Sequence, residues 1–194
     1  FIDGPSPERE KKCENKSFIL FVGTFEPRKN IEKLIQAFSL SEVCKEKNIN
    51  LVLLGEIGWG KINPEYLAIK FGVEKKVNVI SKVNDETLKY HYENCIFLAL
   101  PSLWEGFGLP IVEAFKFGKP VLVSNRASMP EIAQNGGILV DPDDTMSIKN
   151  GIEKFFEKNR YNRLAKNSKT LSKKYSWEKT AHLTEKVLLM NSKI

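Results

Sequence analysis

Short apolar runs alternate along this chain with segments of helical periodicity, and this alternation limits its fold more than any other feature. Runs bounded by glycine, proline or polar residues are typical of strands buried on both faces. Strands that alternate with helices predict an α/β fold, a Rossmann-like doubly wound six-stranded parallel sheet with right-handed crossovers. The expected strands are 17–23, 50–55, 77–80, 95–100, 121–124 and 138–140.

The helices are predicted from apolar residues three or four positions apart. Ile31, Leu34, Ile35 and Phe38 predict a helix that continues to about residue 47, with Asn30 as its N-cap. Further helices are expected at 64–71, from 84 onward, at 111–117, near 129–134, and in a tail that begins at 144 and breaks near 159 and 175–176.

Ligands of such a sheet bind beyond the carboxyl ends of its strands. The loops 24–30, 56–60, 81–84 and 102–110 all follow strands at that edge and should converge on one cleft. The sequence contains no Walker A motif and no dinucleotide-binding fingerprint, because 58–60 lacks the third glycine.

The loop 102–110 carries the main candidate site. Glu105 and Glu113 lie eight residues apart, with Gly106 and Gly108 between them and Pro110 where a helix should begin. A helix start offers free N–H groups and partial positive charge to an anion, and glycines allow a ligand to approach closely. The stretch therefore predicts a site for a phosphorylated ligand. Glu113, expected in the first helical turn, either accepts hydrogen bonds from a ribose diol or only decorates the helix.

Arg28 and Lys29 precede the first crossover helix and either reach phosphate oxygens or form an exposed basic pair. They are also the available cations to offset Glu105 and Glu113. Trp59 and Phe107 are candidates for stacking on a ligand ring, although core packing or loop anchoring is equally open for Trp59.

Metal and redox sites have little support in the sequence. The Asp-x-Asp of residues 141–144 is interpreted as a helix N-cap at Asp143 or Asp144 rather than a metal site. His91 and His182 lack metal-ligand spacing, and the cysteines are interpreted as structural thiols of a reducing compartment. The three cysteines are Cys13, Cys44 and Cys95.

The charge is concentrated in the C-terminal part of the chain. Residues 149–194 hold twelve Lys or Arg and four Glu, a charge of +8, whereas the whole chain carries +6. This segment is a solvated face, a nucleic-acid patch or a surface for anionic lipid. Aromatic residues do not interleave with the basic ones, so no nucleic-acid partner is expected. The apolar runs are too short to cross a bilayer. We expect a cytoplasmic protein with peripheral contact at the inner face of the membrane.

The stretch Glu105-Gly-Phe-Gly-Leu-Pro-Ile-Val-Glu113 resembles the Glu-x7-Glu signature of retaining glycosyltransferases of the GT-B fold, family 4 or group 1. From Phe18 to about Leu189 the chain resembles their C-terminal domain, and most of all that of bacterial mannosyltransferase-like enzymes. The other matching segments are 22–30, 101–102, 118–121, 124–125, 129–131, 141–142 and 175–177.

The resemblance implies a domain that binds a UDP- or GDP-linked sugar nucleotide and needs no metal. It implies transfer of a hexose, such as mannose, to a glycan or lipid-linked acceptor in surface-polysaccharide synthesis. Arg28 and Lys29 would contact the diphosphate, Glu113 the ribose, and Glu105, as the candidate catalytic residue, would lie beside the donor sugar. Many relatives carry an arginine where this chain has Thr24, and Arg28 is the candidate replacement. The further implied contacts are Gly23, Thr24, Gly106, Phe107, Gly108 and Leu109 for the phosphates and sugar, and Ile80 and Val83 for the base.

The same resemblance divides the chain into an interdomain linker (1–16), the nucleotide-sugar-binding domain (17–174) and a C-terminal helix (175–194). That helix would pack toward an acceptor-binding N-terminal domain absent from this sequence, which begins at Phe1 rather than at a methionine. The fragment alone is expected to bind nucleotide and to transfer nothing. The alternatives are a non-catalytic nucleotide-binding module of this fold and another GT-B enzyme of epimerase or phosphorylase type.

Overall fold

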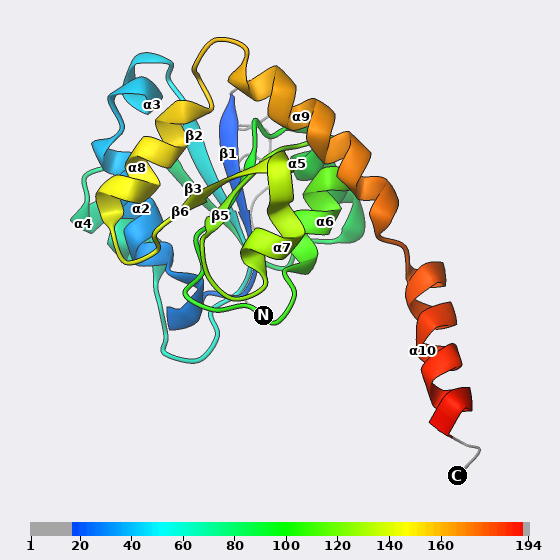
Figure 1. Ribbon diagram of the computed structural model, residues 1–194. Helices are drawn as coiled ribbons and strands as arrows, with labels where there is room; N and C mark the ends of the chain where they lie inside the picture. Colours follow the sequence, from blue (N-terminus) through cyan, green and yellow to red (C-terminus); the bar gives the residue numbers. More distant parts are fainter. Residues whose placement is uncertain (1–16, 192–194) are drawn as a thin grey trace.

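The computed structural model describes residues 17–191, and a six-stranded sheet forms the centre of the molecule (Figure 1). The strand order is β3-β2-β1-β4-β5-β6, and every neighbouring pair is parallel. The order reverses between β1 and β4, so the predicted Rossmann-like, doubly wound sheet is confirmed. The strands are β1 (Phe18–Val22), β2 (Asn50–Leu54), β3 (Val77–Ile80), β4 (Leu98–Leu100), β5 (Val121–Ser124) and β6 (Gly137–Val140).

Helices cover both faces of the sheet, because the strand order runs outward from β1 in one direction and from β4 in the other. One face carries α2 (Ile31–Leu40), α3 (Glu42–Glu46), α4 (Pro64–Lys70) and α8 (Thr145–Lys154). The other carries α5 (Asp85–Asn94), α6 (Leu109–Lys116), α7 (Met129–Ala133) and α9 (Arg160–Leu171). The short 3-10 turns are η1 (Pro27–Lys29), η2 (Gln134–Gly136) and η3 (Ser172–Lys174).

The core lies on both faces of the central strands. All residues of β2 and the first four of β1 are buried, as expected for apolar strands covered by helices on each side. Where α8 ends, Phe155 stacks on Phe97 with 3.8 Å between the ring centroids. This stacking packs the C-terminal end of α8 against the residues that lead into β4.

Several predicted boundaries are wrong for identifiable reasons. The helix expected to reach about residue 47 ends at Leu40, because Ser41 adopts an extended conformation and its side chain caps α3. Asn30 stands at the N-cap position of α2 but caps nothing with its side chain, because its φ is 60° and its amide is used elsewhere. The fourth strand begins at Leu98 rather than Cys95, which forms the end of α5.

The helix after the glycine loop begins two residues earlier than predicted, at Leu109, so Pro110 is its second residue. Glu113 was predicted to lie in the first helical turn. Because α6 begins earlier, Glu113 lies beyond that turn. The capping prediction for the acidic segment is confirmed, since the side chain of Asp144 accepts a hydrogen bond from the Met146 N–H at 2.8 Å.

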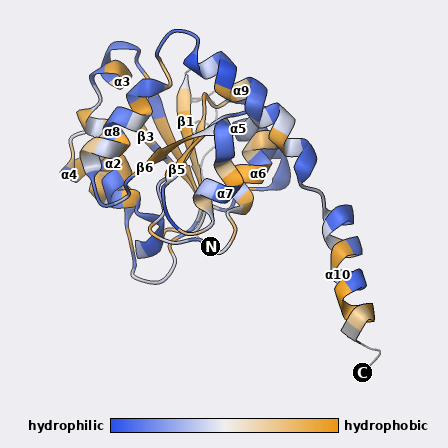
Figure 2. Cartoon of the chain, in the orientation of Figure 1, coloured by the Kyte–Doolittle hydropathy of each residue, from blue (hydrophilic) through white to orange (hydrophobic). Residues whose placement is uncertain are grey.

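The C-terminal tail breaks where predicted, and α10 (Trp177–Asn191) projects away from the body of the molecule (Figures 1 and 2). Its large apolar side chains are more than half exposed, namely Trp177, Leu183, Val187, Leu188, Leu189 and Met190. Among residues 17–191 there is no helix with the length and apolar character to cross a membrane. The predicted linker 1–16 with Cys13, and the last three residues of the predicted C-terminal helix, lie outside the described residues.

Candidate functional site

The loops that follow β1, β2 and β4 lie against one another at the carboxyl edge of the sheet, as predicted for three of the four loops. Within residues 17–191, no hydrogen bond joins the fourth loop, 81–84, to these three. The N–H of Phe25 donates to Glu56 O at 2.7 Å, and the N–H of Leu103 donates to Arg28 O at 2.7 Å. Just beyond the ends of β1 and β2, the backbones of Gly23 and Gly55 lie close together: an added Cβ at Gly55 would lie 2.0 Å from Gly23 O. Glycine at position 55 is therefore required by space.

Glu105 is the centre of a buried ion-pair cluster at this edge. One carboxylate oxygen accepts a hydrogen bond from Lys29 Nζ at 2.5 Å and from Ser102 Oγ at 3.0 Å. The other accepts one from Arg28 Nη1 at 2.9 Å, and Arg28 Nε donates to Glu26 at 2.8 Å. The side chains of Lys29 and Glu105 are each 9% exposed. The two cations predicted to offset the acids thus converge on Glu105, and Glu26 and Ser102 complete a cluster with no formal net charge.

Local backbone geometry directs Lys29 into this cluster. Lys29 closes η1, and Asn30 after it takes a left-handed conformation that turns the chain into α2. The Asn30 side-chain amide donates to Pro101 O at 3.0 Å and Pro142 O at 2.7 Å, so it joins the β1 loop to the loops after β4 and β6. Gly23 lies next to the Lys29 side chain, since a Cβ added to Gly23 would be 3.5 Å from Lys29 Nζ. This role of Asn30 was not predicted, because the residues around it are mostly charged and the sequence marks Asn30 only as a candidate N-cap.

The glycine loop before α6 has a constrained backbone. Gly108 precedes the helix with φ of 95°, and a Cβ there would meet Ile111 Cδ1 at 2.9 Å. The Ser128 hydroxyl lies 3.0 Å from Glu105 O and 3.1 Å from Phe107 O, and so ties α7 to both sides of Gly106. Within residues 17–191, no acceptor is recorded for the N–H groups of 106–108. This arrangement leaves them available to an anion.

Glu113 has a partner of its own and does not join the Glu105 cluster. Tyr92 donates its hydroxyl to Glu113 Oε2 at 2.7 Å, and the Tyr92 ring stacks on Phe117 at 5.7 Å between centroids. Burial, together with the Glu113 charge, raises the pKa of the Tyr92 phenol far above its ordinary value. Glu113 is half-buried. Tyr92 therefore fixes one carboxylate oxygen, and within residues 17–191 no hydrogen bond to the other is recorded.

Aromatic side chains project from the loops around the cluster. Trp59 is 63% exposed, which excludes core packing for it, and Trp104 is 61% exposed. Phe107 is 42% exposed and meets Tyr175 edge to face at 5.9 Å. The glycine loop is thus in contact with the segment that leads from α9 into α10.

The acidic segment after β6 is engaged by protein groups. Arg126 pairs with Asp143 at 2.6 Å and lies 3.4 Å from Asp141, while Asp144 caps α8. Within the described part of the chain there is no group of three or more His, Cys, Asp or Glu side chains arranged to hold a metal. His91, for which no metal-ligand role was expected, is buried in α5 with Nδ1 2.7 Å from Thr87 O.

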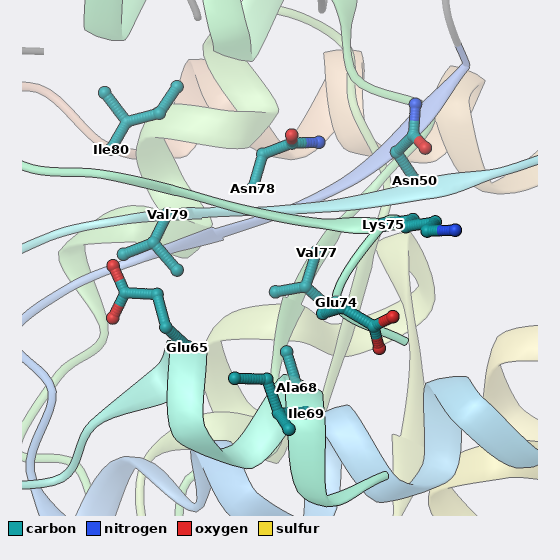
Figure 3. A pocket seen from close by; sticks show the side chains of 10 residues that line it. All are labelled: Asn50, Glu65, Ala68, Ile69, Glu74, Lys75, Val77, Asn78, Val79 and Ile80. Carbon is teal, nitrogen blue, oxygen red and sulfur yellow. The ribbon is translucent and has the colours of Figure 1, made fainter. Parts of the chain in front are cut away.

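A groove of about 470 Å³ lies elsewhere, along edge strand β3 and helix α4 (Figure 3). Val77 and Val79 point toward α4, while Asn78 and Ile80 point to the opposite side of the strand (Figure 3). Of the predicted site residues only Ile80 lines this groove. The structure records no contact between 80–83 and the Glu105 cluster, so base binding by Ile80 and Val83 stays a prediction.

The chain has clear relatives in sequence. The family model described as "Glycosyl transferases group 1" matches residues 5–171. "O-antigen chain mannosyltransferase B" of Escherichia coli is 34% identical over 164 residues, which are 84% of this chain and 43% of the relative. "Serotype-specific mannosyltransferase WbdA" of Escherichia coli is 34% identical over 191 residues, which are 92% of this chain and 23% of the relative. The chain thus spans less than half of either relative.

Solved structures share the fold. Sucrose-phosphate synthase from Thermosynechococcus elongatus matches with a TM-score of 0.79 and 22% identity, over 96% of this chain and 49% of that one. Anabaena HepE in complex with UDP-glucose matches with a TM-score of 0.78 and 20% identity, over 98% of this chain and 54% of that one. The C-terminal domain of a "Glycosyl Transferase Group 1 Family Protein (LpcC)" from Francisella tularensis matches with a TM-score of 0.73 and 18% identity. The match covers 88% of this chain and 94% of that one. The fold of this chain therefore coincides with nearly all of an isolated C-terminal domain.

Proposed function

This chain belongs to the group 1 glycosyl transferases, and on that premise we propose that it is the donor-binding domain of a retaining glycosyltransferase. The observation that carries the proposal is the placement of Glu105 and Glu113 on either side of the start of α6, with both nearby cations held on Glu105. This arrangement offers N–H groups, cations and a free carboxylate oxygen to one ligand. A sugar diphosphonucleotide carries phosphates, hydroxyls and a hexose that match these groups.

The diphosphate is assigned to the glycine loop and the two cations. Backbone N–H groups from Gly106 to Leu109 and the positive end of α6 receive phosphate oxygens. Lys29 has three donors and Arg28 five, so each keeps donors after its recorded bonds. Thr24 is exposed and lies against Gly58, where a Cβ would meet Thr24 Cγ2 at 2.5 Å. Many relatives carry an arginine at the position of Thr24. We assign its contact with the diphosphate to Arg28, the arginine nearest to Thr24 in the sequence.

The ribose is assigned to Glu113. Its carboxylate accepts one hydrogen bond from Tyr92 and has lone pairs left for the ribose hydroxyls. The hexose is assigned to the side of Glu105, whose position is fixed by three donors. Cleavage of the sugar–phosphate bond leaves charge on the diphosphate, which the loop N–H groups and both cations stabilise in the transition state. The proposal includes no resident metal or cofactor.

The donor sugar and the acceptor are proposed from the relatives. Two of them are described as O-antigen or serotype-specific mannosyltransferases of Escherichia coli, and HepE is described in complex with UDP-glucose. We accordingly propose transfer of a hexose, such as mannose, from a UDP- or GDP-sugar to a glycan or lipid-linked acceptor on the cytoplasmic side of a membrane. The acceptor-binding half is a separate N-terminal domain, reached through the linker 1–16. The apolar side chains of the helix in 175–194 pack on that half, and 17–174 form the donor domain.

Calorimetric titration of the 194-residue chain with UDP-, GDP- and ADP-sugars tests this function. We expect saturable binding of one nucleotide class and no transfer to an acceptor by this chain alone. Glu131→Ala, in an exposed part of α7, is the control variant and should bind equally well. If none of the three binds, the donor role is refuted and the non-catalytic module of the same fold becomes the better account.

A further inference from the structure

The outer side of α9 is a continuous basic surface. Between Glu157 and Glu178 the chain contains seven Lys or Arg and not one acidic residue. Four of them are exposed on the side of α9 and η3 that faces away from the core, and we call them the basic face: Arg163, Lys166, Lys169 and Lys173. Figure 2 shows α9 coloured mostly as hydrophilic residues.

The opposite side of α9 holds the helix in a fixed orientation. Leu164, Ser168 and Leu171 are buried, at helical spacing that places them opposite the basic face. The Ser168 hydroxyl lies 3.2 Å from Gly136 O, and Asn167 Nδ2 donates to Asn135 O at 2.9 Å. The basic side chains are therefore presented from a rigid helix and not from a loose tail.

The charge of the basic face is not neutralised by neighbouring acids. Within residues 17–191, Arg160 pairs with Glu157 and Lys174 donates to Gln134, but no carboxylate lies within 4.0 Å of the four cations of the basic face. Residues 1–148 carry 18 Lys or Arg and 20 Asp or Glu, by subtraction of the 12 and 4 of the tail from the totals of 30 and 24. The positive field of this chain is thus concentrated around α9.

We propose that the basic face docks on an anionic lipid bilayer. Several cations held in one plane match a surface of anionic headgroups, which attracts each Lys or Arg within a Debye length. Bases of a nucleic acid would need aromatic platforms, and the basic face has none: Tyr161, the aromatic residue of α9, is packed against the core. Continuity with the candidate site supports the choice, since η3 leads into Tyr175, which contacts Phe107 of the glycine loop. The inference rests on the proposed function in that a lipid-linked acceptor is met at such a surface.

Co-sedimentation of the 194-residue chain with vesicles tests the proposal. The vesicles are phosphatidylcholine with or without phosphatidylglycerol, at low and high salt. The test variant replaces Arg163, Lys166, Lys169 and Lys173 by Gln. The matched control replaces four other exposed lysines by Gln: Lys45, Lys47, Lys75 and Lys154. Both variants lose the same charge and keep α10 intact, so apolar adsorption through α10 is equal in both.

We expect the wild type and the control to bind vesicles that contain phosphatidylglycerol and to release them at high salt. Each neutralised cation of the basic face should lower the partition coefficient about fivefold, so the four substitutions of the test variant should together lower it about 600-fold. Equal binding by both variants, or tighter binding to duplex DNA than to the anionic vesicles in direct competition, would overturn the proposal. The basic face has no part in nucleotide binding, so the test variant should bind nucleotide as the wild type does. Titration with nucleotide therefore distinguishes a failure of the lipid-docking proposal from a failure of the proposed donor function.

Discussion

Lys29 Nζ lies 2.5 Å from a carboxylate oxygen of Glu105, although 76 residues separate the two in sequence. Both side chains are almost fully buried. The pair joins the loop after β1 to the loop after β4, and therefore holds together the two sides of the proposed donor site.

Glu105→Gln should lower the free energy of unfolding by about 3 kcal/mol, because it leaves the buried Lys29 ammonium without a counter-charge. Glu26→Gln is the control. In this variant Arg28, which is 35% exposed, still pairs with Glu105, so the free energy of unfolding should fall by about 1 kcal/mol or less. Urea denaturation of the three proteins measures both values. Equal losses for the two variants would show that the Lys29–Glu105 pair has no special weight.

Glu113→Ala should lower affinity for a ribonucleotide about tenfold, because a hydrogen bond to a charged group contributes about 1.5–3 kcal/mol. The same variant should bind a 2′,3′-dideoxynucleotide as the wild type does, since that ligand lacks the ribose hydroxyls. Tyr92→Phe keeps the ring stacked on Phe117 and should produce a smaller loss by freeing Glu113. A loss of equal size for both nucleotides in Glu113→Ala would exclude the ribose role.

Gly55→Ala should lower the free energy of unfolding by about 3 kcal/mol or more, because its Cβ would collide with backbone atoms of Gly23 that cannot move aside. Gly72→Ala is the matched comparison. Its φ is 69° and no atom lies within 4 Å of the added Cβ, so only the backbone conformation is strained, at about 1 kcal/mol. Thermal or urea denaturation distinguishes them. The close approach of Gly55 to Gly23 O requires that Gly55→Ala be the more destabilising of the two substitutions.

Stability should fall as the pH rises above about 9, since burial raises the pKa of the Cys95 thiol from 9.0 to about 12 and that of Cys44 from 9.0 to about 11. Above pH 9 the unfolded chain releases these protons while the folded chain retains them, so alkali favours unfolding. Each thiol contributes a slope of about 1.4 kcal/mol per pH unit in this window. Urea denaturation between about pH 8 and pH 11 should give a shallower decline for Cys44→Ala/Cys95→Ala. Identical slopes would contradict the burial of these thiols.

The sheet was predictable because its strands are apolar on both faces. Strands β3 and β5 begin and end at the predicted residues, since polar residues, glycine or proline flank each run. The break at Ser41 was not predictable from periodicity, because the apolar spacing continues through it. The start of α6 was misplaced because the left-handed Gly108 supplies the N-cap without a side-chain signal.

The candidate site was predictable only in part. The residue types around the glycine loop indicated that Arg28 and Lys29 offset nearby acids, and the structure confirms this for Glu105. Whether Arg28 and Lys29 pair with Glu105 or with Glu113 depends on how the loops pack. The hydrogen bond between Tyr92 and Glu113 depends on this packing too. Asn30 was misinterpreted for the same reason, since both acceptors of its amide come from distant loops.

Chemical-shift mapping of the 15N-labelled chain with UDP, GDP and ADP tests the central claim most directly. The account predicts that one nucleotide shifts the amide signals of Gly106, Phe107, Gly108 and Leu109 together with those of Arg28 and Lys29. The signals of the groove along β3 and α4, such as those of Glu74 and Lys75, should stay in place. Shifts confined to that groove, or no shift with any of the three nucleotides, would contradict the assignment of this loop to a sugar-nucleotide donor.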